Sequence, residues 1–137
     1  MDELIARIEA ASGPDRELDA RIAIAFDLAQ GNVMVGVDGW VINSLTNPNP
    51  HQARDFTGSV DAGLTLVPRG WIVEIRRYFN SDGEYVSSVN LTDSGTVGRG
   101  CHPEEEITVQ SRIVERRDGD DPTPRALCAA ALRARAA

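Results

Sequence analysis

The densest group of side chains that could do chemistry lies in one short stretch of the sequence. Cys101 and His102 are followed closely by a run of three glutamates. A metal site would need three or four such ligands to converge on one ion, and side chains adjacent in sequence rarely point at the same place. His51 is the only other histidine, so no second cluster completes a site. The sequence therefore favours a solvated loop, and it predicts no metal and no cofactor.

An enzymatic interpretation of the same stretch needs a cysteine–histidine nucleophile pair. Adjacent side chains on a strand diverge, so Cys101 and His102 would not easily share a hydrogen bond. His51 could serve Cys101 only if two long loops met. All 14 basic residues are arginine, which excludes a Schiff-base lysine, a phosphate-loop lysine and a Ser-Lys dyad. The glycines at 95, 98 and 100 follow no parallel strand into a helix, so they indicate a loop rather than a nucleotide site. The sequence predicts a protein that is not an enzyme.

The net charge of −7 suggests a different kind of chemistry, recognition by charge. Two acidic runs could imitate phosphates and occupy a basic nucleic-acid channel on a partner. They consist of Glu104, Glu105, Glu106 and of Asp118, Asp120, Asp121. The simpler interpretation, which we favour, is that both runs are solvated, since Arg112, Arg116 and Arg117 lie between them and partly cancel their charge. The acidic balance makes direct nucleic-acid binding unfavourable.

The elements that must position these residues follow from periodicity and turn residues. Apolar spacing and capping residues predict helices over 2–11, 14–29 and 59–67, with Ser59 as an N-cap, and a last helix capped by Thr123. Strands are expected over 33–37 and 40–43 around an Asp38-Gly39 turn, and over 71–79, 85–92 and 107–114. The stretches 44–55 and 93–103 are expected to be loops. The order α-α-β-β-α-β-β-β-α predicts one α+β domain over 1–137, with an antiparallel sheet of about five strands packed against helices.

Alternation along the predicted strands separates a core face from a polar face. Phe79 and Tyr85 are expected to point inward, and Trp40 is expected in the core. The outward residues are polar, so this face is either solvated or covered by a partner: Glu74, Arg76, Tyr78, Ser88, Asn90, Thr108, Gln110 and Arg112. Among them Arg76, Tyr78 and Arg112 are the interface candidates, because arginine and tyrosine are enriched at binding hot spots.

Four blocks of the sequence resemble small proteins encoded by phages and prophages. They are RELDARIA at 16–23, FTGSVDAGL at 56–64, LVPRGW at 66–71 and TPRALCAAAL at 123–132. The chain thus resembles the phage ABA-sandwich domain family. Each block fits a structural element, and the resemblance supplies no catalytic residues. The family's usual Gly-Trp after the first block is replaced here by Asp27-Leu28-Ala29-Gln30.

These observations lead to an expectation about function. The resemblance implies a phage or prophage accessory protein, and the missing catalytic constellation implies action by binding a host protein or protein complex. An anti-defence inhibitor, directed for example at a CRISPR effector, would be one such protein. The alternative is a sponge for a small ligand or nucleotide signal, with residues 44–55 and 93–103 forming its pocket. The acidic N-terminus lacks the features of a signal peptide and no apolar run could span a membrane, so the host cytoplasm is expected.

Overall fold

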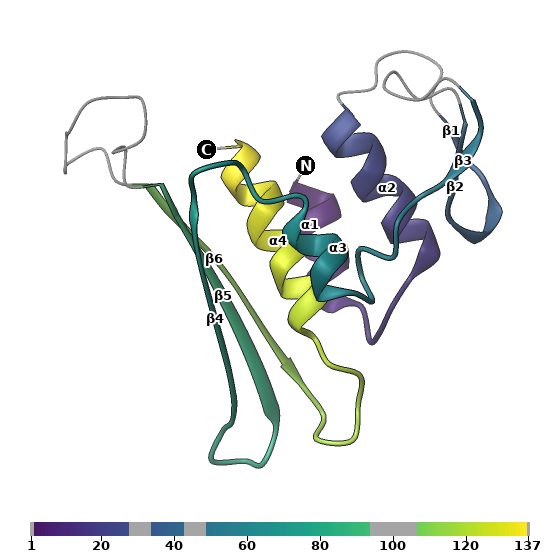
Figure 1. Cartoon of the computed structure of the whole chain (residues 1–137). Helices are drawn as coiled ribbons and strands as arrows, with labels where there is room; N and C mark the ends of the chain where they lie inside the picture. The colour runs from purple at the N-terminus through teal and green to yellow at the C-terminus, as the bar shows by residue number, and fades with distance from the viewer. Residues whose placement is uncertain (1, 28–33, 43–48, 94–106, 137) are drawn as a thin grey trace.

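A computed structural model gives the arrangement of residues 2–27, 34–42, 49–93 and 107–136. Its helices and strands are α1 (Asp2–Ala10), α2 (Arg16–Asp27), β1 (Met34–Val35), η1 (Val37–Gly39), β2 (Trp40–Ile42), β3 (His51–Gln52), α3 (Val60–Leu64), β4 (Ile72–Phe79), β5 (Tyr85–Asp93), β6 (Ile107–Glu115) and α4 (Thr123–Ala136). Helices lie between a large and a small sheet (Figure 1). The α+β class is therefore confirmed.

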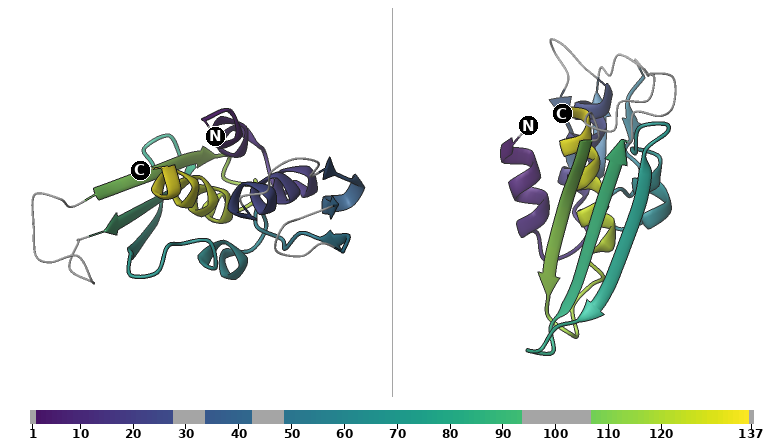
Figure 2. Two further views of the ribbon diagram at one scale, coloured as in Figure 1. Left: turned by 90° about the horizontal axis from the view of Figure 1, so that it is seen from above. Right: turned by 90° about the vertical axis from the view of Figure 1, so that its left-hand side faces the viewer.

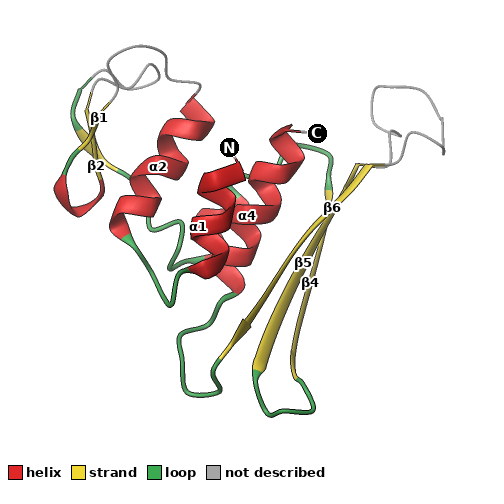
Figure 3. Ribbon diagram, turned by 180° about the vertical axis from the view of Figure 1, so that it is seen from behind, coloured by secondary structure: helices red, strands yellow, loops and turns green. Residues whose placement is uncertain are grey.

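The prediction of a single sheet of about five strands is wrong. The strands form two antiparallel sheets of three strands each. The small sheet has the order β1-β2-β3 and the large sheet the order β4-β5-β6. Residues 51–52 were expected to be part of a loop, but they form the short edge strand β3, which pairs His51 with Val41. A two-residue strand at a sheet edge tolerates the prolines that precede it. In Figure 3 the two sheets lie on opposite sides of the helices.

Helix α4 occupies the middle of the molecule. Its residues from Thr123 to Leu132 are all buried, and it packs against β5 and β6 on one side and against α1 and α3 on the other. Small side chains make this position possible: Ala126, Ala129, Ala130 and Ala131 are all fully buried. A helix that is buried on every side over its first ten residues is a core helix, whereas an ordinary surface helix has one apolar stripe.

Local sequence explains most of the remaining elements. The Ser59 hydroxyl accepts a hydrogen bond from the Ala62 amide at 3.3 Å, as expected of an N-cap. Asp38 and Gly39 have φ values of 54° and 82°, the positive angles that the hairpin turn between β1 and β2 requires. Between β4 and β5 the Asn80 side chain accepts hydrogen bonds from two backbone amides of the turn.

Two aromatic residues lie outside the core that the sequence predicted for them. Trp40 is 41% exposed on the small sheet. Phe79 has the inward register but is 53% exposed, because it ends β4, in a cluster with Tyr85 at 5.5 Å and Arg117 at 5.0 Å rather than in the apolar core.

Candidate functional site

One face of the large sheet carries no described helix or strand. Figure 2 shows the three strands from this side, with α4 behind them. The pairing register places the outward residues in four cross-strand rows: Ile72, Thr92, Thr108; Glu74, Asn90, Gln110; Arg76, Ser88, Arg112; and Tyr78, Val86, Val114. The polar face that alternation predicted is thus assembled as expected. We call these twelve residues the outer face.

The third row brings two of the predicted interface residues into register. Arg76 and Arg112 flank Ser88, so their Cα atoms are about 10 Å apart by the ordinary strand spacing. The Arg76 Nε lies 2.8 Å from a carboxylate oxygen of Glu74, and Gln110 donates to the Ser88 hydroxyl at 3.0 Å. Both Arg76 and Arg112 are exposed. The row therefore presents two exposed arginines whose backbone positions are fixed by the sheet.

An apolar row lies beside the two arginines. Tyr78 is 43% exposed and Val114 is 39% exposed, while Val86 between them is completely buried. Ile72, at the opposite end of the face, is 59% exposed. Apolar and aromatic side chains next to arginine are the composition of the buried part of a protein–protein interface.

The acidic residues predicted to bind a partner lie elsewhere. Asp121 caps the start of α4, because its Oδ1 accepts from the amide of Thr123 at 3.0 Å and from the hydroxyl of the same residue at 2.7 Å. Its other oxygen lies 3.4 Å from Arg77. Asp118 pairs with Arg116 at 3.5 Å in an exposed turn. This run therefore contributes to the local structure of a turn and a helix start.

Asp120, the remaining acidic residue of this run, lies close to Gly13. A Cβ added to Gly13 would lie 2.5 Å from an Asp120 carboxylate oxygen, so the acidic turn lies against the segment between α1 and α2. The other acidic run, Glu104, Glu105 and Glu106, lies outside the described residues. The same is true of Cys101 and His102.

Of the residues considered for metal binding or catalysis, His51 lies in the described part of the chain. His51 lies in β3, where its Nδ1 is 3.1 Å from the carbonyl oxygen of Asn49. Among the described ranges, no three histidine, cysteine or acidic side chains are placed to hold a metal ion. Most of the proposed ligand pocket, residues 44–48 and 94–103, also lies outside the described residues.

A buried polar network that sequence reasoning missed joins α2 to the segment before α3. The Asp19 carboxylate, completely buried, accepts from the Thr57 amide and hydroxyl, both at 2.7 Å, and from Arg16 at 2.6 Å. Arg16 also donates to the Ala53 carbonyl at 2.6 Å. Burial raises the pKa of Asp19 above its ordinary value, against the opposing hydrogen bonds from Thr57.

The Cys128 thiol lies close enough to Asp19 to be affected by its charge, and it is buried. Its Sγ donates to the Phe56 carbonyl at 3.2 Å, and its side chain is completely buried. Burial, assisted by the negative charge of Asp19, raises the pKa of the Cys128 thiol. A thiol held protonated and away from solvent is not a nucleophile. The network and the thiol therefore hold the fold together.

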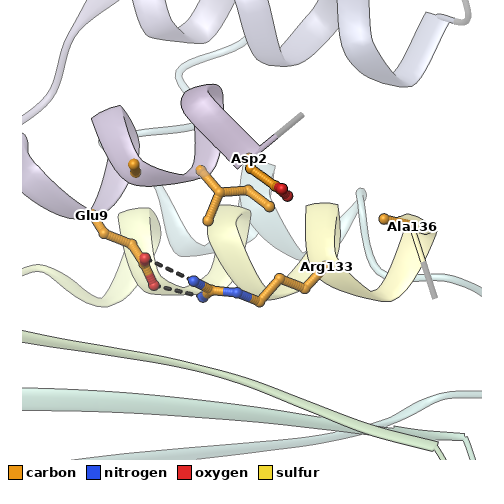
Figure 4. Close-up of a pocket in the computed structure, with 6 residues that line it drawn as sticks. Asp2, Glu9, Arg133 and Ala136 are labelled. Atoms are coloured by element: carbon orange, nitrogen blue, oxygen red, sulfur yellow. Dashed lines mark hydrogen bonds and ion pairs between the residues drawn. The ribbon is translucent and has the colours of Figure 1, made fainter.

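A second missed interaction closes a shallow hollow of about 310 Å³ between α1 and α4. Arg133 donates to both oxygens of Glu9, at 2.6 and 2.8 Å, and Figure 4 shows this two-point contact. The Ser111 hydroxyl donates to the same carboxylate at 2.6 Å. These bonds hold the pKa of Glu9 below its ordinary value and raise that of Arg133. No local pattern could have predicted a pair 124 residues apart.

The hollow is not a convincing binding site, because its two charged groups already neutralise each other. A larger hollow of about 520 Å³ lies where α2, the start of β4 and the end of α4 meet, with Phe26, Leu66, Trp71 and Arg135 among its lining residues. There the Arg135 guanidinium stacks over the Phe26 ring, 5.1 Å from its centre. The positive charge of Arg135 is therefore already in contact with a neighbouring side chain.

Comparison of the chain with family models, with curated proteins and with solved structures gives no match. Within the described ranges, no helix is both long and apolar enough to cross a membrane. On the outer face, exposed arginines lie beside exposed apolar side chains, a composition found at protein–protein interfaces.

Proposed function

We propose that this chain is a non-enzymatic accessory protein of phage or prophage origin that acts by binding a host protein through the outer face. The observation that carries the proposal is the exposed Arg112, in one row with Arg76, whose partner Glu74 is close by, and beside the apolar row of Tyr78 and Val114. An interface needs apolar area for affinity and charged groups for orientation, and this face offers both.

The charge of the face specifies the partner further. Its charged residues are Glu74, Arg76 and Arg112, a net of +1, whereas the whole chain carries −7. Since the rest of the molecule repels anionic surfaces, the outer face is where an acidic patch of a folded protein can dock. Inhibition of a host defence complex is the form of this activity that the phage-like sequence blocks favour.

The test is a set of four matched affinity captures from host lysate. Wild-type protein is compared with Arg112→Glu and Tyr78→Ala, which alter the outer face, and with Arg54→Glu, an exposed residue before α3. Arg54→Glu changes the net charge by the same amount as Arg112→Glu, so it controls for charge alone. We expect one host protein to be retained by wild type and by Arg54→Glu and to be lost from both outer-face variants.

Two results would contradict the proposal. One is a capture in which no host protein is enriched over an unrelated acidic protein. The other is a capture in which the outer-face variants retain the same protein as wild type, which would place the interface elsewhere. Purified candidates should also bind more weakly at high salt, because the contact of the arginines with an acidic patch is screened.

A further inference from the structure

The two edge strands of the large sheet, β6 and β4, differ in what they contact. At the β6 edge, Arg133 donates to the backbone carbonyl of Gln110 at 3.0 Å, and α1 packs alongside. At the other edge, β4 has β5 as its one strand neighbour among the described residues. All eight residues of β4 pair with β5 without a bulge, and β4 contains no proline. A long, regular edge strand with unpaired backbone groups is a template for pairing with another strand.

The turn after β4 fixes which backbone groups point toward that edge. The Asn80 amide donates to the Glu84 carbonyl at 2.9 Å, so residues of even number in β4 exchange hydrogen bonds with β5. The amides and carbonyls of Val73, Ile75, Arg77 and Phe79 consequently point away from the sheet. An antiparallel strand added at this edge must place residues whose own backbone amides and carbonyls point toward β4 directly opposite these four residues.

One antiparallel register of β4 with a second copy of β4 satisfies this requirement and also matches the side chains. With the two-fold axis at Ile75, each Glu74 lies opposite Arg76 of the second copy, and each Ile72 lies opposite Tyr78 of the second copy. On the inner side, Val73 lies opposite Arg77 of the second copy, and Trp71, directly before β4, lies opposite Phe79 of the second copy. Opposite charges, aliphatic with aromatic, and aromatic with aromatic are the favourable cross-strand pairs.

The neighbouring registers lack this match. Moving the axis by one residue in either direction places Glu74 opposite Glu74 of the second copy, or Arg76 opposite Arg76. Like charges directly opposite each other destabilise a sheet. In the matched register the charged residues occupy non-hydrogen-bonded positions, where cross-strand side chains lie closest. Because Arg76 already contacts Glu74 within each strand at 2.8 Å, the four side chains form a closed ring of alternating charge.

We propose that this chain forms a two-fold homodimer in which two β4 strands pair antiparallel about Ile75, giving a continuous six-stranded sheet. The occupant of the β4 edge is thus a second copy of the chain, selected by the alternating Glu74 and Arg76 charges. Dimerisation leaves the outer face uncovered and doubles it, with one Arg112 on each side of the axis. This inference does not depend on the identity of any host partner.

Sedimentation velocity over a concentration series of the full chain tests the dimer directly. Glu74→Arg and Arg76→Glu each place like charges opposite one another at two symmetry-related positions, so each variant should dimerise about tenfold more weakly or worse. Both residues are exposed, and circular dichroism of each variant checks that the monomer remains folded. Wild type should show a concentration-dependent dimer.

The proposed register predicts two further results that an interface elsewhere on the molecule would not give. The double variant Glu74→Arg/Arg76→Glu restores every pair and should dimerise as wild type does. An equimolar mixture of the two single variants pairs a chain carrying two arginines with a chain carrying two glutamates, so it should form a heterodimer. Both outcomes together would identify the strand and its register.

Three outcomes would overturn the proposal. Wild type could sediment as a monomer at every concentration, the single variants could dimerise as tightly as wild type, or the charge-swapped double variant could stay as weak as the single variants. None of these measurements involves host proteins or Arg112. Failure of the dimer is therefore distinct from failure of the proposed partner-binding activity.

Discussion

The charged pair of Arg125 and Glu115 gives the sharpest test of how the core is stabilised. Arg125 is completely buried in α4, and one of its terminal nitrogens lies 3.0 Å from Glu115, whose side chain is 16% exposed. The Nε and the other terminal nitrogen of Arg125 have no hydrogen-bond partner among the described residues. Burial thus removes the guanidinium from water, which is energetically unfavourable, and the single ionic contact with Glu115 compensates for this only in part.

This arrangement predicts unequal effects for the two halves of the pair. Glu115→Gln leaves the buried guanidinium without a countercharge and should lower the free energy of unfolding by about 2–3 kcal/mol, somewhat below the usual cost of deleting a partner because an amide oxygen still accepts. Arg125→Met removes the charge together with its unpaired donors and fills similar volume. It should change stability by about 1 kcal/mol at most, in either direction, because Glu115 can turn to solvent.

Urea unfolding at neutral pH, followed by circular dichroism, measures both free energies. Arg116→Met is the matched control, since the contact of Arg116 with Asp118 at 3.5 Å is exposed and should contribute about 0.5 kcal/mol or less. A result in which Arg125→Met costs as much as Glu115→Gln would refute the reasoning. It would mean that the interactions of the guanidinium, rather than its burial without partners, dominate at this position.

Three further predictions follow from other buried contacts. Glu9→Gln removes the negative charge of the α1–α4 pair and should lower the free energy of unfolding by about 1.5 kcal/mol at neutral pH. Since the folded-state pKa of Glu9 is lowered, the stability difference between wild type and variant is fully present above pH 4.5 and disappears as the pH falls through the lowered pKa. Urea unfolding at several pH values measures this difference. In a Cys101→Ser background, Cys128 should react with a thiol reagent only as fast as the core opens, and rapid labelling of the native protein would contradict its burial. Gly63→Ala should destabilise by about 1 kcal/mol in thermal unfolding, because the added Cβ would lie 3.0 Å from Leu127 Cδ2, and no loss would mean that α3 can shift away from α4.

The sequence was sufficient to predict elements whose determinants are local. The positive φ values at Asp38 and Gly39, the Ser59 cap and the alternation along β4 all depend on residues that are neighbours in the chain. The division into two sheets was not predictable in this way. Which strands pair is decided by how the helical layer between them packs, and alternation alone shows only that a strand has two different faces.

Charged residues inside the fold were beyond sequence reasoning for a related reason. Arg125 and Arg133 lie in the same helix and look alike in the sequence, yet one is fully buried and the other is paired on both oxygens of Glu9. A charged residue on a helix is ordinarily read as solvated. Only the distant partner, 124 residues away for Glu9 and Arg133, reveals its role.

Three of the four sequence blocks described above, those at 16–23, 56–64 and 123–132, are joined by hydrogen bonds in the fold. Arg16 and Asp19 of the first block bond to Thr57 of the second or to the chain just before it, and the second block accepts a hydrogen bond from Cys128 of the fourth. These three blocks therefore supply contacts that join α2 and α4 to the segment before α3. All twelve residues of the outer face, and the charges at the β4 edge, lie outside every block. A chain could keep the four blocks, and with them this core, while its outer face changed to suit a different partner. If the chain binds a partner through the outer face as proposed, we expect partner choice to reside in 72–92 and 107–114, outside the four blocks.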